Sequence, residues 1–197
     1  ACFFYKLHIF LDIFKLRHIC VFSIQKLMKS NKNLIFLGMM GSGKSTIGKL
    51  VSKRLKLQFI DVDHQIENKL KMKILDIFEI KGEKYFRNLE EKISLKYLRE
   101  GKKIISLGGG AFLNYIVRKE ILQNHLSFWL YWSPEILLKR LKNSKKRPLI
   151  YKAKEADILN LIKKRNKIYS KALFKIKCDN LSKLEIVDKI IKIYENN

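Results

Sequence analysis

The chain has 197 residues, of which 47% are hydrophobic and 30% charged, with nine glycines and two prolines. This length and composition fit one globular domain, and they exclude a fibrous chain, a largely disordered chain and two full-sized enzymatic domains. The formal charge of +24 is spread along the chain rather than gathered in a patch or stripe, which favours a compositional bias over nucleic-acid binding. The three cysteines, Cys2, Cys20 and Cys178, show no metal-binding spacing and indicate free thiols in a reducing compartment.

Residues 1–27 are rich in isoleucine and aromatic residues, but charged residues interrupt every apolar run: Lys6, Asp12, Lys15 and Arg17. The interruptions argue against a membrane-spanning helix, and the segment lacks the continuous apolar stretch of a secretory signal. Since Met28 stands just before the first predicted strand, we separate residues 1–27, as a leader, from a single domain at 28–197.

Short strand-like runs alternate with longer helical runs after Met28. The predicted strands cover residues 34–38, 57–61, 103–108, 127–132 and 175–179. This alternation predicts an α/β fold with a parallel sheet. Two capping patterns support the element boundaries, because Ser133 precedes Pro134 at one helix start, and Ser182 with Glu185 forms a capping box at the last. A lysine-rich polar stretch at about 143–154 separates two helical patterns and is a candidate lid.

Residues 38–45 read GMMGSGKS and satisfy the pattern G-x-x-x-x-G-K-[ST] between a strand and a helix. Glycines allow backbone N–H groups to surround phosphates, and the helix N-terminus adds partial positive charge. Lys44 is expected to neutralise the β- and γ-phosphates, and the Ser45 hydroxyl to ligate Mg²⁺. The sequence therefore predicts an ATP site, although this loop alone does not separate kinases from other nucleotide-binding proteins.

Asp61 and Asp63 follow the second predicted strand. In extended geometry, residues two apart point the same way, so both carboxylates are expected to face the ligand edge of the sheet. One would serve the metal and the other would hold an acceptor hydroxyl and take its proton. The alternative is an ordinary helix start, in which Asp63 caps a helix at 64–71.

Three arginines are candidates for anion binding, because the planar guanidinium group binds carboxylates and phosphates bidentately. They are Arg87, Arg147 in the candidate lid, and Arg165. Residues 108–110 are three glycines after the third predicted strand, at the edge where open α/β sheets bind ligands. We interpret this segment as a loop that contacts substrate, with a flexible turn as the alternative.

Together these motifs resemble the shikimate kinase family in order and spacing, over Lys32 to Tyr194. They are GMMGSGKST at 38–46, DVD at 61–63, GEKYFRNLEE at 82–91, SLGGGA at 106–111, RPLI at 147–150 and RNKIY at 165–169. The resemblance implies a three-layer P-loop fold of nucleoside-monophosphate-kinase type, with a lid and a five-stranded parallel sheet in the order 2-3-1-4-5. It also implies transfer of the ATP γ-phosphate to the 3-hydroxyl of shikimate, a step of aromatic amino-acid biosynthesis.

The same resemblance implies roles for individual residues. Shikimate would be held by Asp63, Arg87, Gly109 and Arg165, with Asp63 at the reacting hydroxyl and the two arginines at the carboxylate. Lys44 and Arg147 would act with Asp63 in catalysis, and Asp61 would be an outer-shell partner of the Mg²⁺ on Ser45. The ATP site would comprise Gly41, Ser42, Gly43, Lys44, Ser45, Thr46, Arg140 and Arg147.

Two departures from the family pattern stand out. Lys167 and Ile168 replace the usual Pro-Leu before Tyr169, which loosens the assignment of Arg165, and the segment NLSKLE at 180–185 matches the family's adenine-contacting region poorly.

Alternative functions are another small-molecule kinase such as a gluconate kinase, a noncatalytic shikimate-kinase-like binding protein, and a basic P-loop protein that binds nucleic acid. We expect a cytoplasmic monomer whose partners are shikimate and ATP, with no nucleic acid or membrane partner, or a plastid enzyme if residues 1–27 are a genuine transit segment.

Overall fold

The computed structural model describes residues 31–142 and 154–196, and the compact unit considered below begins at Asn33. The predicted leader at 1–27 lies outside the described residues. So do residues 143–153, which include Arg147 and nearly all of the predicted lid. Within the two described ranges, no helix is long and apolar enough to cross a membrane.

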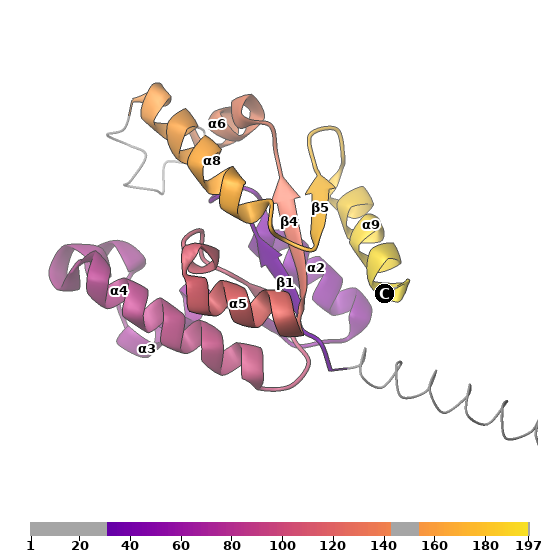
Figure 1. Cartoon of the computed structure of the whole chain (residues 1–197), viewed down its shortest axis with the longest axis horizontal. Coiled ribbons are helices and arrows are strands. Elements are labelled where there is room, and N and C mark those ends of the chain that lie inside the picture. Colours follow the sequence, from indigo (N-terminus) through magenta and orange to yellow (C-terminus); the bar gives the residue numbers. More distant parts are fainter. Residues whose placement is uncertain (1–30, 143–153, 197) are drawn as a thin grey trace, which may run out of the picture. The chain divides into compact units, whose positions relative to one another are not determined.

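Five parallel strands form one sheet in the order β2-β3-β1-β4-β5, which confirms the predicted order (Figure 1). The central strand β1 is buried along its whole length and pairs with β3 on one side and β4 on the other. A strand buried on both faces is a continuous apolar run, as LIFL is here. Each strand lies within three residues of its predicted start and end: β1 Leu34–Leu37, β2 Phe59–Asp61, β3 Ile104–Ser106, β4 Leu126–Tyr131 and β5 Phe174–Lys177.

Helices cover both faces of this sheet, as the three-layer prediction requires. In Figure 1, α2 and α9 lie on one side of the strands, and α4, α5 and α8 lie on the other. Such crossover helices are what parallel strands need for their connections. The helical elements are α2 Lys44–Leu55, α3 Val62–Leu70, α4 Ile74–Arg99, the 3₁₀ turn η1 Ala111–Leu113, α5 Tyr115–Asn124, α6 Pro134–Lys142, α8 Glu155–Tyr169 and α9 Lys183–Glu195.

The end of β2 differs from the prediction. Residues 61–63 are not all extended, because the side chain of Asp61 accepts from the backbone N–H of His64 at 3.4 Å and starts α3 at Val62. This contact satisfies an N–H group that a helix start otherwise leaves without a partner. The extended geometry expected for this segment is therefore wrong after Asp61, and the cap is Asp61 rather than Asp63.

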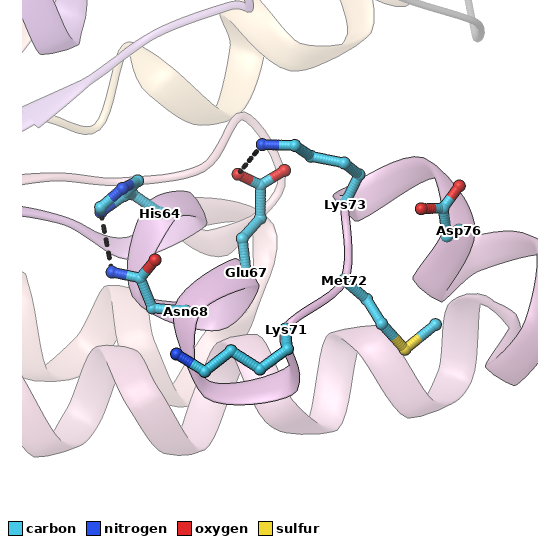
Figure 2. Close-up of a pocket in the computed structure, with 7 residues that line it drawn as sticks. All are labelled: His64, Glu67, Asn68, Lys71, Met72, Lys73 and Asp76. Atoms are coloured by element: carbon cyan, nitrogen blue, oxygen red, sulfur yellow. Dashed lines mark hydrogen bonds and ion pairs between the residues drawn. The ribbon is translucent and has the colours of Figure 1, made fainter.

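The connection between α3 and α4 is held by Glu67. Its Oε1 accepts from the backbone N–H of Ile74 at 3.1 Å, and its Oε2 pairs with Lys73 Nζ at 3.5 Å. A surface groove of about 360 Å³ lies beside this connection (Figure 2). None of the predicted ATP or substrate residues is among those that line the groove, which are His64, Glu67, Asn68, Lys71, Met72, Lys73 and Asp76.

The predicted capping box opens α9. Ser182 Oγ accepts from the Glu185 N–H at 3.3 Å, and Glu185 Oε2 accepts from the Ser182 N–H at 2.7 Å. The hydrogen bonds from Ser182 lower the pKa of Glu185, which means that the ionised form is favoured in the folded state.

We predict that Ser182→Ala lowers the thermal unfolding midpoint by about 2–4 °C, because the helix loses one of its N-terminal caps. The contribution of Glu185 should be present at neutral pH and be lost as the pH falls through its lowered pKa. Calorimetry at neutral and acidic pH measures both effects. Ser52→Ala, the same deletion inside α2, is the control and should leave the midpoint unchanged or slightly raised; equal losses in both variants would contradict the capping role.

Candidate functional site

Residues 38–45 between β1 and α2, called the P-loop from here on, form a cradle for an anion. Lys44 Nζ is buried and donates to the backbone carbonyls of Gly38 and Met39 at 3.0 and 3.1 Å. Gly43 occupies the N-cap of α2 in a left-handed conformation (φ 91°) and has no side chain to cap the helix. An anion at this helix end could accept from the N–H groups of the first turn, and the helix dipole favours a negative charge there.

Ser45 and Asp61 supply a pair of oxygen ligands beside this cradle. Ser45 Oγ donates to Asp61 Oδ2 at 2.5 Å, which joins the first turn of α2 to the end of β2. Among the described residues no group of three or more histidine, cysteine, aspartate or glutamate side chains could hold a metal ion. One hydroxyl and one carboxylate suit Mg²⁺, because that ion is usually bound by few protein oxygens together with phosphates and water.

Two of the three glycines after β3 stand where a side chain would meet charged groups. A Cβ atom on Gly108 would collide with Asp63 Oδ1 and Glu90 Oε1, and one on Gly110 would collide with the guanidinium group of Arg87. None of the three glycines has a positive φ. Close approach of charged side chains, rather than an unusual backbone angle, therefore favours glycine at positions 108 and 110.

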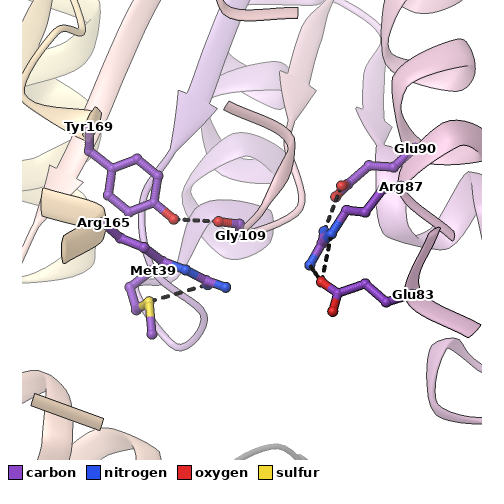
Figure 3. A network of polar contacts seen from close by, with 7 residues as sticks. All are labelled: Met39, Glu83, Arg87, Glu90, Gly109, Arg165 and Tyr169. Carbon is purple, nitrogen blue, oxygen red and sulfur yellow. Dashed lines mark hydrogen bonds and ion pairs between the residues drawn. The ribbon is translucent and has the colours of Figure 1, made fainter. Parts of the chain in front are cut away.

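Arg87 lies between two carboxylates on α4. A non-helical glycine, Gly82 (φ 80°), interrupts α4, and the helical run that follows carries Glu83, Arg87 and Glu90 on one side. Arg87 Nη1 donates to Glu90 Oε2 at 2.7 Å, while its Nε and Nη2 donate to Glu83 Oε1 at 3.2 and 3.1 Å (Figure 3). The guanidinium is therefore held in one orientation by its own helix.

The electrostatics of this group follow from its burial. Desolvation raises the pKa of Glu90, and the opposing attraction of Arg87 does not cancel that effect. Desolvation also lowers the pKa of Arg87, but Glu90 and Glu83 together raise it above its ordinary value. Glu90 is 2% exposed, whereas the Glu83 side chain is 67% exposed. Glu90 is therefore the stronger of the two partners of Arg87, because an exposed ion pair such as that with Glu83 contributes little to stability.

A second arginine reaches residues 108–110, called the glycine loop from here on, from α8. Arg165 Nη1 donates to Met39 Sδ at 3.5 Å and would lie 3.2 Å from a Cβ atom on Gly109. Tyr169, one helical turn further, donates its hydroxyl to the Gly109 carbonyl at 2.5 Å. Desolvation raises the pKa of Tyr169 to about 12, so that its hydroxyl remains a donor at neutral pH. Figure 3 shows the guanidinium groups of Arg165 and Arg87 directed towards the same space from opposite sides.

The fold thus gathers most of the predicted site residues in two neighbouring places, whose roles remain predictions. Asp63, Arg87 and Arg165 surround residues 108–110. The first turn of α2 carries Lys44, Ser45 and Thr46, and Arg140 Nε donates to the Gly41 carbonyl at 3.1 Å. The loops are adjacent, because a Cβ atom on Gly109 would lie 3.6 Å from the backbone nitrogen of Met40. An anion cradle beside two guanidinium groups and a carboxylate suits phosphoryl transfer to an acceptor that carries a carboxylate.

Two residues of this site were missed by sequence reasoning. Glu90 follows Arg87 by three positions on a helix, a spacing at which side chains meet, but an acid among many charged residues does not stand out. Tyr169 follows Arg165 by four positions, and its role depends on a carbonyl 60 residues away, which no local pattern reveals.

Comparison with known proteins gives a consistent result. A sequence model of the shikimate kinase family matches residues 40–195. The chain is 37% identical to a shikimate kinase of Persephonella marina over 81% of this chain and 97% of that protein. It is also 39% identical to one of Sulfurihydrogenibium sp. over 81% and 96%.

Solved structures agree with the sequence relatives. A shikimate kinase from Acinetobacter baumannii in complex with shikimate is 29% identical, with a TM-score of 0.79 over 87% of this chain and 97% of that one. A shikimate kinase from Aquifex aeolicus is 36% identical, with a TM-score of 0.74 over 84% and 97%. A gluconokinase from Sinorhizobium meliloti is 14% identical, with a TM-score of 0.54, and shows likeness of fold alone.

We predict that Tyr169→Phe lowers the free energy of unfolding by about 1–3 kcal/mol, because the Gly109 carbonyl is left without its buried donor. Urea denaturation measures the loss. Tyr115→Phe removes the same hydroxyl from a side chain that is 66% exposed, and it should cost close to nothing. A Tyr169→Phe protein as stable as the Tyr115→Phe protein would show that the contact with Gly109 contributes nothing to folding.

Proposed function

The chain belongs to the shikimate kinase family and phosphorylates shikimate with ATP; from this premise we propose that the 3-hydroxyl is the acceptor and describe how the side chains carry out the reaction. One observation carries the proposal, namely the convergence of Arg87, Arg165 and Asp63 on the glycine loop next to the P-loop. The convergence places groups suited to a carboxylate and a hydroxyl beside groups suited to phosphates.

The two arginines bind the carboxylate of shikimate. Arg87 keeps Glu90 as its buried partner on Nη1 and exchanges the exposed Glu83 for the substrate, because Glu83 occupies the Nε and Nη2 edge. A bidentate pair on that edge is a strong charge-assisted contact. Arg165 meets the same carboxylate from α8, and the Gly109 backbone completes the contact.

Asp63 holds the 3-hydroxyl and accepts its proton as the phosphoryl group is transferred. Its Oδ1 lies against Gly108, in the same loop that Arg87 and Arg165 approach. An aspartate in this position works mainly by aligning the hydroxyl with the phosphorus atom, since positioning dominates phosphoryl transfer. We assign two roles to Arg147 in the predicted lid: it stabilises the negative charge of the transferred phosphoryl group, and it helps to exclude water.

The P-loop residues Gly41 to Thr46 bind the phosphates of ATP, and Arg140 lies at the nucleobase end. Lys44 leaves the carbonyls of Gly38 and Met39 for the β- and γ-phosphates. Ser45 is the protein ligand for Mg²⁺, and Asp61 orients it by accepting the hydroxyl proton at 2.5 Å. When bound, Mg²⁺ neutralises charge on the phosphate oxygens. The serine oxygen keeps a lone pair for the ion because its hydrogen points to Asp61.

We further propose that the enzyme acts as a cytoplasmic monomer with ATP and shikimate as its partners. The bacterial origin of the relatives supports this setting, and the resemblance to the family supports the oligomeric state. A basic nucleic-acid protein would have no use for an Arg87 that is held beside the substrate loop by the buried Glu90. A noncatalytic binding protein is disfavoured because the P-loop lysine and Asp63 are both present.

The direct test is ADP release by purified protein from Met28 onward, with ATP and Mg²⁺, and with shikimate, gluconate or no acceptor. We expect turnover that depends on shikimate, because two arginines and one aspartate match a carboxylate and a ring hydroxyl. Turnover with gluconate alone would show that the protein is a kinase but would contradict shikimate as its substrate. Folded protein that binds ATP but gives no turnover would refute the enzymatic function.

Two variants separate binding from chemistry. Arg87→Ala should raise the KM for shikimate about 10- to 100-fold and change kcat less, because it removes a charge-assisted contact to the carboxylate. Asp63→Asn should lower kcat about 10²- to 10⁴-fold, since the amide cannot take the proton. Steady-state kinetics with each substrate varied in turn measure both.

Matched controls keep the same chemical changes away from the site. Arg99→Ala removes an arginine whose side chain is 64% exposed, and Asp76→Asn neutralises an acid in the first turn of α4; both should leave kcat and KM unchanged. An Arg87→Ala enzyme with normal shikimate affinity and turnover would overturn the substrate site.

A further inference from the structure

Trp132 connects the end of β4 to the P-loop. It is the residue that follows β4, it is 9% exposed, and its Nε1 donates to the backbone carbonyl of Ser42 at 2.9 Å. Most core aromatic side chains only fill space, but this indole makes a directed hydrogen bond to the loop that cradles the phosphates. Its N–H is satisfied by a backbone atom 90 residues away in sequence.

The other side of the indole carries Arg140. The guanidinium carbon of Arg140 lies 4.1 Å from the centroid of the Trp132 ring, close enough for cation–π stacking. Arg140 Nε also donates to the Gly41 carbonyl at 3.1 Å, and Nη2 would lie 3.8 Å from a Cβ atom on Gly43. Arg140 is otherwise exposed. The guanidinium therefore lies over the indole and beside the P-loop.

These contacts fix two successive peptide groups of the loop. In a trans peptide, the C=O of one residue and the N–H of the next point in opposite directions. Holding the Ser42 carbonyl on the indole therefore turns the Gly43 N–H away from the indole. The hydrogen bond from Arg140 holds the preceding carbonyl, that of Gly41, in the same way.

We propose that Trp132 is a positioning residue for the nucleotide: its N–H orients the P-loop through Ser42, and its ring holds Arg140 over that loop at the proposed ATP site. A planar guanidinium stacks well on an aromatic ring. Because the indole and the Gly41 carbonyl already hold Arg140, its remaining donors meet the nucleotide at little entropic cost. The inference rests on the proposed ATP site, and it adds a residue that no motif of the sequence indicated.

The first test separates the two contacts of Trp132. Trp132→Phe keeps an aromatic ring and loses the hydrogen bond, and it should raise the KM for ATP and the Kd for ADP about fivefold. Trp132→Leu also loses the stacked ring and should raise both about tenfold or more. The KM for shikimate should change less than twofold in either. Unchanged ATP constants in both variants, or an equal rise in both KM values, would overturn the proposal.

The second test asks whether Trp132 acts through Arg140. Arg140→Met changes an exposed side chain and should fold normally, which keeps the proposal testable even if a Trp132 variant does not fold. It should raise the KM for ATP on its own, and in the double variant with Trp132→Leu the two losses should not add. Fully additive losses, or no loss in Arg140→Met, would overturn the coupling.

The matched control is a second cation–aromatic pair. Lys102 Nζ lies 5.0 Å from the ring of Tyr194, and neither residue contributes to the sites described above. Tyr194→Leu should leave both KM values unchanged.

A separate readout uses Trp129→Phe, which leaves Trp132 as the single tryptophan of the chain. The fluorescence of Trp132 should respond to ADP more than to shikimate, and the reverse response would contradict the assignment. Failure of the proposed reaction is distinguishable, because ADP binding would still depend on Trp132 when shikimate gave no turnover.

Discussion

The absence of side chains at residues 108–110 is the constraint on which the rest of the site depends. Asp63, Glu90 and Arg87 occupy space that Cβ atoms on Gly108 and Gly110 would fill, and Arg165 lies close beside Gly109. Charges of both signs are thus brought together in a partly desolvated place, where their interactions are stronger than at the surface. The loop sets the positions of the charged groups, and the groups in turn define what the loop can bind.

The sheet brings this loop to the P-loop. Both loops follow neighbouring parallel strands, β3 and β1, and Asp61 ends the next strand, β2. The carboxyl ends of parallel strands share one edge, so residues far apart in sequence meet there. The helices add side chains from outside the sheet: Asp63 comes from α3, Arg87 and Glu90 from α4, and Arg165 and Tyr169 from α8. This arrangement places an anion cradle and an acceptor site side by side without a separate substrate domain.

Much of this arrangement could be predicted from the sequence. The P-loop and the capping box at Ser182 follow from motifs with strict spacing. The strand order was implied by the resemblance to the family, and the structure confirms it. The extended conformation expected for residues 61–63 was wrong, because the hydrogen bond from the His64 N–H to Asp61 starts a helix at Val62. The roles of Glu90, Tyr169 and Trp132 were missed. Their contacts depend on burial or on backbone atoms distant in sequence, and a pattern of residue types along the chain reveals neither of these.

The most direct test of the account is a crystal structure of the protein with shikimate and ADP bound. The account predicts the shikimate carboxylate between the guanidinium groups of Arg87 and Arg165, with Glu83 displaced from Arg87 and Glu90 still bound to it. The 3-hydroxyl should lie within hydrogen-bond distance of Asp63 and face the phosphate end of ADP. Shikimate bound elsewhere, or with its carboxylate away from both arginines, would contradict the central claim.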